Sequence, residues 1–549
     1  MDRIQIGNRF IGEGCPAYLI AEMSANHAGS LERAREIIHA AKESGADCIK
    51  VQTYTPDTLT IDCSNQYFQV KNGTWEGENL YQLYGKGYMP WEWQPILKDE
   101  AEKVGIDFLS TAFDRTSVDF LEEMGLQFYK IASFEMPDLP LVEYVASKGK
   151  PVILSTGMGT LEEIREAVAA VRKTGNSQLA LLKCSSAYPA DPGEMHLAAI
   201  QDMKRRFQVP IGLSDHTMGH MSALVAVALG AKIIEKHFCL SREIENPDAS
   251  FSMTPEEYAA MAKEIRAAEE AIGQPVYGIS PGEESSVVFR RSIFTVKDIK
   301  KGEALTEENT RVIRPGYGLK PRYYRDVIGM RAGRDLERGT PLAFDGLEKG
   351  AILFATNNPN TEDLYQWLAE REPKVYKIEN KLTAQMVEQL APSFVISFNY
   401  RHLIPQEVLS LLPGRVINLH ASLLPYNRGS SPNFFSFLED TPKGVTIHLV
   451  DKGLDTGDIL CQREISFDEE KETFASSYDR LLQEIKALFR ENWEKIKTGA
   501  LEPVPQRGEG TSHKMKELNA IRARMPFAWE EQIARFKERF QEESGEGNL

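Results

Sequence analysis

Two histidines follow consecutive apolar runs in the stretch GLSDHTMGHMSALVAVALGAKIIEKHF, residues 212–238. Residues 211–213 lead to His216, a helical run of Ala, Val and Leu comes next, and residues 231–234 lead to His237. Parallel strands in a barrel end on one face, so we expect the two imidazoles to be neighbours. Two imidazoles beside carboxylates favour a divalent first-row metal. The alternative is two unrelated histidines, each hydrogen-bonded for structural reasons.

A second set of residues suited to catalysis lies nearer the C-terminus. The apolar run at 415–420 ends in Asn-x-His, formed by Asn418 and His420, and a Leu-Asp-Thr-Gly-Asp turn that contains Asp455 follows. An amide can donate to an oxyanion, an imidazole can carry a proton, and a carboxylate can orient that imidazole. Together these side chains are suited to proton transfer and to stabilising an oxyanion.

The first pair of histidines must be positioned by a longer alternation of strands and helices. Helical patterns, such as 31–45, 161–175 and 255–273, separate or follow eight apolar runs. The strand candidates are 17–23, 48–54, 107–113, 128–133, 151–157, 179–186, 211–216 and 233–238. Eight consecutive units predict an α/β fold of the (β/α)8 TIM-barrel type. A doubly wound open sheet is the structural rival, but it rarely gives eight units in unbroken order.

Polar side chains stand at nearly every predicted strand end, which indicates a lined pocket. Glu22 ends the first strand, and Lys50 and Lys130 end two others. Lysines beside hydroxyl groups offer charge and hydrogen-bond donors for a phosphate and a carboxylate. The alternatives are solvated surface charges for the lysines and a structural ion pair for Glu22.

Length, charge and cysteine usage bound the class of protein. The chain has 549 residues, which suggests three or four domains, or fewer if one is a barrel. Its net charge of −16 argues against a general nucleic-acid surface, although a local basic cluster can still bind phosphate. The six cysteines are scattered without a CxxC motif, so we expect reduced thiols and a cytoplasmic location. The N-terminus is no signal peptide, and no apolar run is long enough to cross a membrane.

The first 280 residues resemble the nonulosonate synthase family, whose best-known member is N-acetylneuraminate synthase. Details such as MPWEWQ (89–94) and RPGYGL (314–319) are more similar to the pseudaminic acid synthase branch than to the neuraminate or legionaminate branches, which remain alternatives. The segments that carry the resemblance are SANHAGS (24–30), KVQTYTPDTLTID (50–62), YKIASFE (129–135), STGMGT (155–160), LLKCSSAYPADP (181–192), GLSDHT (212–217) and IIEKHF (233–238).

This resemblance implies condensation of phosphoenolpyruvate with an open-chain amino-sugar aldehyde, a 2,4-diamido-2,4,6-trideoxy hexose of altrose type, with release of phosphate. A divalent metal, Mn²⁺ or a similar ion, on His216 and His237 would polarise the aldehyde. Glu22 would stabilise an oxocarbenium-like carbon or orient water. The implied substrate-binding residues are Lys50, Gln52, Thr111, Lys130, Ser186, Tyr188, Ser214, Glu235 and Asp248.

A Pro-, Gly- and Ser-containing segment, 274–286, reads as a linker to a small β-rich module at 285–348. The module resembles the antifreeze-like (SAF) domain of sialic acid synthases. That resemblance implies a domain-swapped homodimer in which Arg314 contacts the acyl-amino sugar. The alternative for Arg314 is a surface arginine that stabilises a turn.

Residues 350–510 resemble the formyltransferases that use N10-formyltetrahydrofolate, through SLLP (422–425) and GVTIHLVDKGLDTGD (444–458). The resemblance implies a Rossmann-like domain in which Asn418, His420 and Asp455 are catalytic, followed by a helical tail at 511–549. YRHLIP and NLHASLLPYNRG are closer to sugar N-formyltransferases than to the initiator-tRNA enzyme. Fusion to the synthase leads to the hypothesis that the acceptor is a UDP-4-amino-4,6-dideoxy sugar. The alternative is a regulatory domain that binds nucleotide-sugar or folate without turnover.

Overall fold

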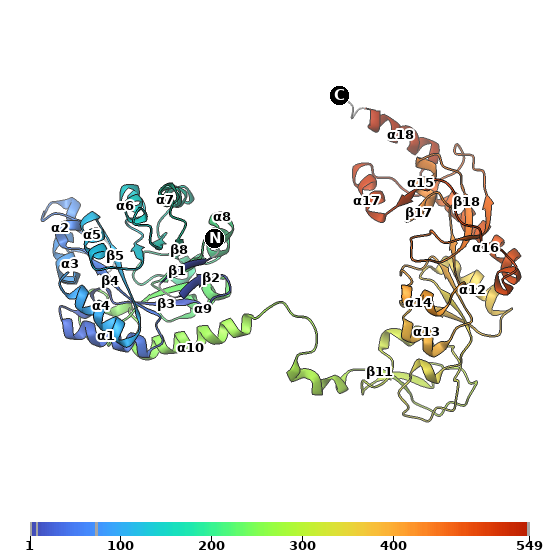
Figure 1. Cartoon of the computed structure of the whole chain (residues 1–549), viewed down its shortest axis with the longest axis horizontal. Helices are drawn as coiled ribbons and strands as arrows, with labels where there is room; N and C mark the ends of the chain where they lie inside the picture. Colours follow the sequence, from blue (N-terminus) through green and yellow to red (C-terminus); the bar gives the residue numbers. More distant parts are fainter. Residues whose placement is uncertain (1–2, 7–8, 72–74, 546–549) are drawn as a thin grey trace. The chain divides into compact units, whose positions relative to one another are not determined.

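A computed structural model describes residues 3–6, 9–71 and 75–545 of the chain. The chain divides into two compact units, Met1–Tyr277 and Gly278–Leu549 (Figure 1). Within the described residues, no helix is both long enough and apolar enough to span a lipid bilayer.

The first unit contains a closed barrel of eight parallel strands in the order β10-β3-β4-β5-β6-β7-β8-β9. All eight predicted strands are present, which confirms the predicted TIM barrel. Their interiors are apolar and buried, as parallel strands covered by helices require. The strands are β3 Tyr18–Glu22, β4 Cys48–Thr53, β5 Asp107–Ala112, β6 Tyr129–Ile131, β7 Val152–Ser155, β8 Leu179–Cys184, β9 Ile211–Asp215 and β10 Ile233–His237.

Amphipathic helices cover the outside of the barrel (Figure 1). Helix α1, Leu31–Glu43, is typical: the Ser30 side chain caps its N-terminus, and a stripe that includes Ile37 and Ile38 is buried. The other large helices are α4 Trp93–Val104, α5 Arg115–Glu123, α6 Leu139–Ala146, α7 Leu161–Lys173, α8 Ala199–Phe207, α9 Met221–Ala228 and α10 Pro255–Ile272.

Two additions to the barrel lie outside the predicted alternation. An antiparallel hairpin, β1 Arg3–Ile6 and β2 Arg9–Gly12, packs Ile4 and Ile11 into a cluster with barrel residues such as Ile20. The connection from β4 to β5 carries the short helices α2 Pro56–Leu59 and α3 Leu80–Gly87 before α4. The hairpin therefore gives an apolar cluster inside the barrel extra cover.

Near the start of the second unit, a 3-10 helix, η5 Pro281–Phe289, overlaps the end of the segment predicted to be a linker, 274–286. This helix was not predicted; Ser280 and Glu283 form a capping box that starts it. The boundary between the two units, Tyr277 and Gly278, lies inside the predicted linker. The following SAF module has one antiparallel pair, β11 Ser292–Thr295 and β12 Thr310–Ile313, together with isolated bridges and the short helix α11 Tyr324–Val327. It is built more from loops than the predicted β-rich module.

A six-stranded sheet in the order β14-β13-β15-β16-β18-β19 follows. Its first four strands are parallel, β18 is antiparallel to β16, and β19 is antiparallel to β18, so the predicted Rossmann-like arrangement extends into a mixed sheet. The strands are β13 Ile352–Ala355, β14 Val375–Ile378, β15 Phe394–Phe398, β16 Val416–His420, β18 Gly444–Leu449 and β19 Ile459–Glu464. The helices are α12 Glu362–Ala369, α13 Ala384–Leu390, α14 Gln406–Leu411, α15 Pro432–Leu438 and α16 Phe474–Thr498.

The SAF module and this sheet share one hydrophobic core. Tyr323 and Val327 of the SAF module belong to the same buried cluster as Leu353, Tyr376 and Ile378 of the sheet. The tail forms α17 Met515–Arg524 and α18 Ile533–Gly545 as predicted, and the last predicted tail residues, 546–549, lie outside the described part. The second unit is therefore one packed body.

Candidate functional site

The end of the barrel where its strands finish contains a buried cluster of charges. The register pairs Glu22 of β3 with Lys50 of β4 and with His237 of β10. The Lys50 Nζ lies 2.5 Å from Glu22 Oε2 and 3.0 Å from Glu235 Oε1. Ser214 donates to Glu235 over 3.1 Å. Four predicted site residues thus meet around one ammonium group.

Burial and nearby charges shift the pKa values of the two carboxylates of this cluster, Glu22 and Glu235, in opposite directions. Burial raises the pKa of Glu22 against the opposing effect of Lys50, and the charge of Glu235 adds to the rise. Burial also opposes ionisation of Glu235, but the charges of Lys130 and Lys50 lower its pKa to about 2. Two carboxylates that share one ammonium separate in pKa in this way. Glu22 is consequently the one better suited to exchange a proton.

Lys130 is the second buried cation at this end of the barrel. Its Nζ donates to Ser155 Oγ over 2.7 Å, and its strand pairs with Thr111 of β5. Thr111 also accepts from Lys50 Nζ at 3.4 Å. Burial lowers the pKa of Lys130 to about 8, although Glu235 opposes this change. Lys50, Thr111 and Lys130 therefore form a row of donors suited to an anion.

His216 and His237 lie side by side, with ring centroids 5.3 Å apart. His216 Nδ1 contacts Ser185 O at 2.7 Å, which places the proton on Nδ1 and leaves the Nε2 lone pair free to bind a metal. His237 Nδ1 is buried without a hydrogen-bond partner and lies 4.0 Å from Asp248 Oδ2. Burial lowers the pKa of His237 well below its ordinary value, which keeps the ring neutral.

The neutral His237 ring and the unpaired Nε2 of His216 fit the chemistry of a divalent first-row ion. Among the described residues, no group of three or more His, Cys, Asp or Glu side chains forms a complete metal site. Water and substrate oxygens would have to fill the remaining positions, as they do at open catalytic sites. The metal itself remains a prediction.

Of the other predicted barrel residues, Tyr188 and Asp248 lie beside the paired histidines. The Tyr188 ring lies 4.3 Å from that of His216, and Asp248 accepts from the backbone of Ala25 at 3.1 Å. Gln52 donates to Ser24 at 3.1 Å. Ser186 Oγ is buried without a hydrogen-bond partner. These groups can present aromatic and polar surface to a sugar.

Two further polar side chains at this end were not predicted. Glu135 has a buried Oε2 without a hydrogen-bond partner, and burial raises the pKa of its carboxyl group to about 7. Cys184 ends β8, and its Sγ lies 3.9 Å from His216 Nδ1. Glu135 follows the strand end YKIAS, so the rule that drew attention to Lys130 could also have found it.

Arg314 belongs to the second unit. It lies in the loop after β12, where its side chain is exposed and its peptide bond to Pro315 is cis. Its predicted contact with an acyl-amino sugar stays a prediction.

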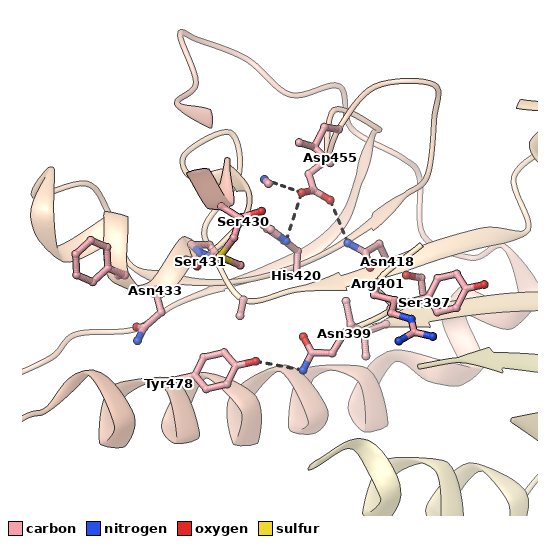
Figure 2. Close-up of a pocket in the computed structure, with 18 of the residues that line it drawn as sticks. Ser397, Asn399, Arg401, Asn418, His420, Ser430, Ser431, Asn433, Asp455 and Tyr478 are labelled. Carbon is pink, nitrogen blue, oxygen red and sulfur yellow. Dashed lines mark hydrogen bonds and ion pairs between the residues drawn. The ribbon is translucent and has the colours of Figure 1, made fainter. Parts of the chain in front are cut away.

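In the second unit, Asn418, His420 and Asp455 converge as predicted (Figure 2). Asn418 Nδ2 donates to Asp455 Oδ1 over 3.1 Å, and His420 Nδ1 lies 3.7 Å from Asp455 Oδ2. Gly429 N also donates to Asp455, over 2.8 Å. Burial opposes ionisation of Asp455, but His420 and His448 lower its pKa well below the ordinary value. The carboxylate therefore stays charged beside the His420 ring.

His448 was not predicted as part of this site. It is the one polar ring within the apolar strand β18, and the register places it opposite Asn418. Its Nδ1 contacts Leu449 O at 2.7 Å, so its Nε2 accepts from Asn418 Nδ2 at 3.3 Å. Both N–H groups of the Asn418 amide thus have acceptors, and one must be released before Asn418 can donate to an oxyanion.

These residues line a cavity of about 900 Å³. One part is polar, with Arg401 and with Asn399, which donates to Tyr478 over 3.2 Å (Figure 2). Another part is aromatic, with Phe434 and Trp529. A cavity of this size is within the range of small-molecule binding sites, and His420 lies in its wall.

The sequence matches three family profiles. These are the NeuB family over residues 37–277, the SAF domain over residues 290–348 and the formyl transferase family over residues 346–491. The part of the chain up to residue 348 and the part that follows are therefore related to different protein families.

Pseudaminic acid synthases are among the relatives of the first part. The protein of that name from Campylobacter jejuni (strain 81-176) is 42% identical over 339 residues, which cover 62% of this chain and 98% of that protein. The one from Helicobacter pylori is 41% identical and covers 61% of this chain and 98% of that protein. For the later part, the formyltransferase PseJ from Anoxybacillus kamchatkensis, solved with UDP-4,6-dideoxy-4-formamido-L-AltNAc and tetrahydrofolate, is 37% identical. It covers 34% of this chain and 96% of that chain, with a TM-score of 0.32.

Proposed function

Because the chain belongs to the NeuB family and also carries a SAF domain and a formyl transferase domain, we propose a bifunctional enzyme of nonulosonic acid synthesis. The barrel condenses phosphoenolpyruvate with a 2,4-diamido-2,4,6-trideoxy hexose of altrose type, giving a pseudaminic acid and phosphate. The second unit transfers a formyl group from N10-formyltetrahydrofolate to an amino sugar. Both reactions take place in the cytoplasm.

The buried charge cluster supports the condensation. Lys50, Thr111 and Lys130 hold the phosphate and carboxylate of phosphoenolpyruvate. The enol carbon bonds to the aldehyde carbon, water adds to the cationic carbon that results, and the intermediate expels phosphate by breaking its C–O bond. The negative charge of Glu22 first stabilises the cationic carbon that develops. Glu22, with its raised pKa, then takes the proton of the incoming water.

His216 and His237 would hold a divalent metal, which supplies Lewis-acid polarisation of the aldehyde oxygen when bound. Tyr188 and Asp248 flank these rings and orient the sugar. In a homodimer with exchanged SAF domains, Arg314 would complete the sugar site of the partner subunit.

In the second unit, the amine of a UDP-4-amino-4,6-dideoxy sugar attacks the formyl carbon of the folate. Asn418 releases one of its two acceptors and donates to the oxyanion. His420 takes the amine proton, and Asp455 stabilises the imidazolium that forms. The proton then passes to the folate nitrogen as the C–N bond breaks, which leaves a formamide and tetrahydrofolate.

The observation that carries the synthase proposal is the position of the Glu22–Lys50–Glu235 cluster next to the paired histidines. The test supplies phosphoenolpyruvate with the aldehyde precursors of pseudaminic, legionaminic and neuraminic acids, and measures phosphate release and product mass. We expect the fastest turnover with the pseudaminic precursor. Faster turnover with either of the others would reassign the sugar.

The formyl transfer is best tested in the full chain, because the sheet shares its core with the SAF module. Incubation with N10-formyltetrahydrofolate and the UDP-4-amino sugar should add one formyl group, detectable by mass spectrometry, and His420→Ala should abolish this addition. Binding of both ligands without any mass gain would instead support a regulatory domain.

A further inference from the structure

A second hollow lies where the SAF module meets the formyltransferase sheet, within the same compact unit. It has a volume of about 460 Å³. Arg322, Tyr324 and Arg325 contribute from the SAF module, and Glu379, Asn380 and Arg401 contribute from the sheet. Arg401 also lines the formyl-transfer cavity, so the two hollows adjoin at this side chain.

The groove carries more positive than negative charge, with three arginines and one carboxylate, Glu379. Among the described residues, Arg322 and Arg401 have no carboxylate within ion-pair distance, and Arg325 reaches Glu379 only at 4.0 Å. Arg322 donates instead to Tyr323 OH at 2.7 Å, and Arg401 Nε lies 3.2 Å from His402 Nε2. In a chain of net charge −16, three guanidinium groups against one carboxylate in one groove favour an anionic ligand.

Lys381 is a further cation near this groove, since its charge acts on His402, the neighbour of Arg401. Burial lowers the pKa of His402, and the charges of Arg401 and Lys381 lower it further. His402 therefore stays neutral while the positive field around it comes from Arg401 and Lys381. Neither of these two residues has a carboxylate partner within ion-pair distance in the part of the chain that the structure describes.

Hydrogen bonds fix the two sides of the groove to each other. Asn380 Nδ2 donates to Arg322 O at 2.7 Å and to Asp326 Oδ2 at 2.9 Å. Glu379 N donates to Asp326 Oδ1 at 2.9 Å, and Asp326 is 2% exposed. These contacts hold the SAF arginines at a set position relative to the formyl-transfer cavity.

We propose that this groove binds the anionic part of a substrate of the adjoining cavity, so that the SAF module completes a site of the formyltransferase. The inference rests on the proposed formyl transfer. The bound part is a chain of negatively charged groups that extends away from the reacting groups of the substrate. Two substrates have this chemistry: the diphosphate of a nucleotide-sugar and the glutamate tail of a folate.

Equilibrium binding to the full chain tests the proposal without requiring turnover. Calorimetry measures the affinity for UDP, and for tetrahydrofolate with one or with five glutamates. The variants are Arg325→Ala, whose side chain is 85% exposed, and the double variant Arg322→Ala/Arg325→Ala. A matched control, Arg311→Ala/Arg334→Ala, removes two exposed SAF arginines that lie outside the groove.

We expect the double variant to weaken binding of one ligand about tenfold, to reduce the salt dependence of that binding, and to leave the melting temperature unchanged. A loss confined to the five-glutamate folate identifies the tail, and a loss confined to UDP identifies the diphosphate. Affinities that match the control for every ligand, or a wild-type chain that binds none of them, would overturn the proposal. Normal binding without formyl transfer would refute the proposed reaction and leave the groove assignment intact.

Discussion

Replacing Asp455 by Asn tests the proposed role of the carboxylate in formyl transfer. Asp455 lies 3.7 Å from His420 Nδ1, and its side chain is 13% exposed. The substitution keeps the size of the side chain but removes its negative charge. The imidazolium that forms when His420 takes the amine proton then loses its counter-charge.

The expected loss follows from the distance. Two unit charges 3.7 Å apart interact by about 4 kcal/mol at an effective dielectric constant of about 20. Because about 1.4 kcal/mol corresponds to a factor of ten, kcat should fall about a thousandfold. Asp455 also accepts from both Gly429 N and Asn418 Nδ2, and an amide has only one oxygen. One of these donors loses its acceptor, which lowers stability by about 1–3 kcal/mol.

The assay follows tetrahydrofolate formation at saturating N10-formyltetrahydrofolate and UDP-amino sugar. Phosphate release from phosphoenolpyruvate by the barrel of the same preparation serves as an internal control and should not change. Circular dichroism checks that the second unit is folded. If the folded variant retained kcat within tenfold of the wild type, the proposed stabilisation of His420 by Asp455 would be wrong.

Four further outcomes are expected. Lys50→Met leaves Glu22 and Glu235 buried without their shared cation, so condensation should stop. Thermal denaturation should show a loss of about 3–5 kcal/mol in the first unit only, and an unchanged unfolding transition of that unit would contradict this. Lys130 has a pKa of about 8, so kcat/KM for phosphoenolpyruvate should be highest below that pH, where the cation predominates, and fall above it; Lys130→Arg, which stays charged, should remove the fall. A chelator should stop phosphate release and spare formyl transfer, with Mn²⁺ restoring the former; full condensation in chelator would exclude a metal requirement. Gly429 has φ +90°, and a Cβ there would lie 2.4 Å from His513 O, so Gly429→Ala should lower the melting temperature of the second unit and slow formyl transfer; wild-type values for both would show that the loop adapts.

The barrel could be predicted because its signals are local. Each strand is an apolar run, and each functional group stands at the end of such a run. Glu22, Lys50 and His237 are brought together by strand order and register alone. The sequence could not indicate that Lys50 sits between two carboxylates, because that depends on side-chain packing across three strands.

The features that were missed depend on short or non-periodic signals. The short helix η5 was not predicted, because the Pro and Gly around it outweighed the capping pair Ser280 and Glu283. His448 was available as the one titratable side chain in an apolar strand, but no spacing rule links it to Asn418, which faces it from the neighbouring strand. The arginine groove could not be predicted, since Arg322 and Arg401 come from different domains.

The hydrophobic core that Tyr323 and Val327 share with Leu353 and Tyr376 bears on how this chain can be divided. The SAF profile ends at residue 348 and the formyl transferase profile begins at residue 346, so a cut at that seam would expose apolar side chains on both pieces to water. A chimera that includes the formyltransferase domain should therefore also include the SAF module. The two segments should be transferred together as one folding unit.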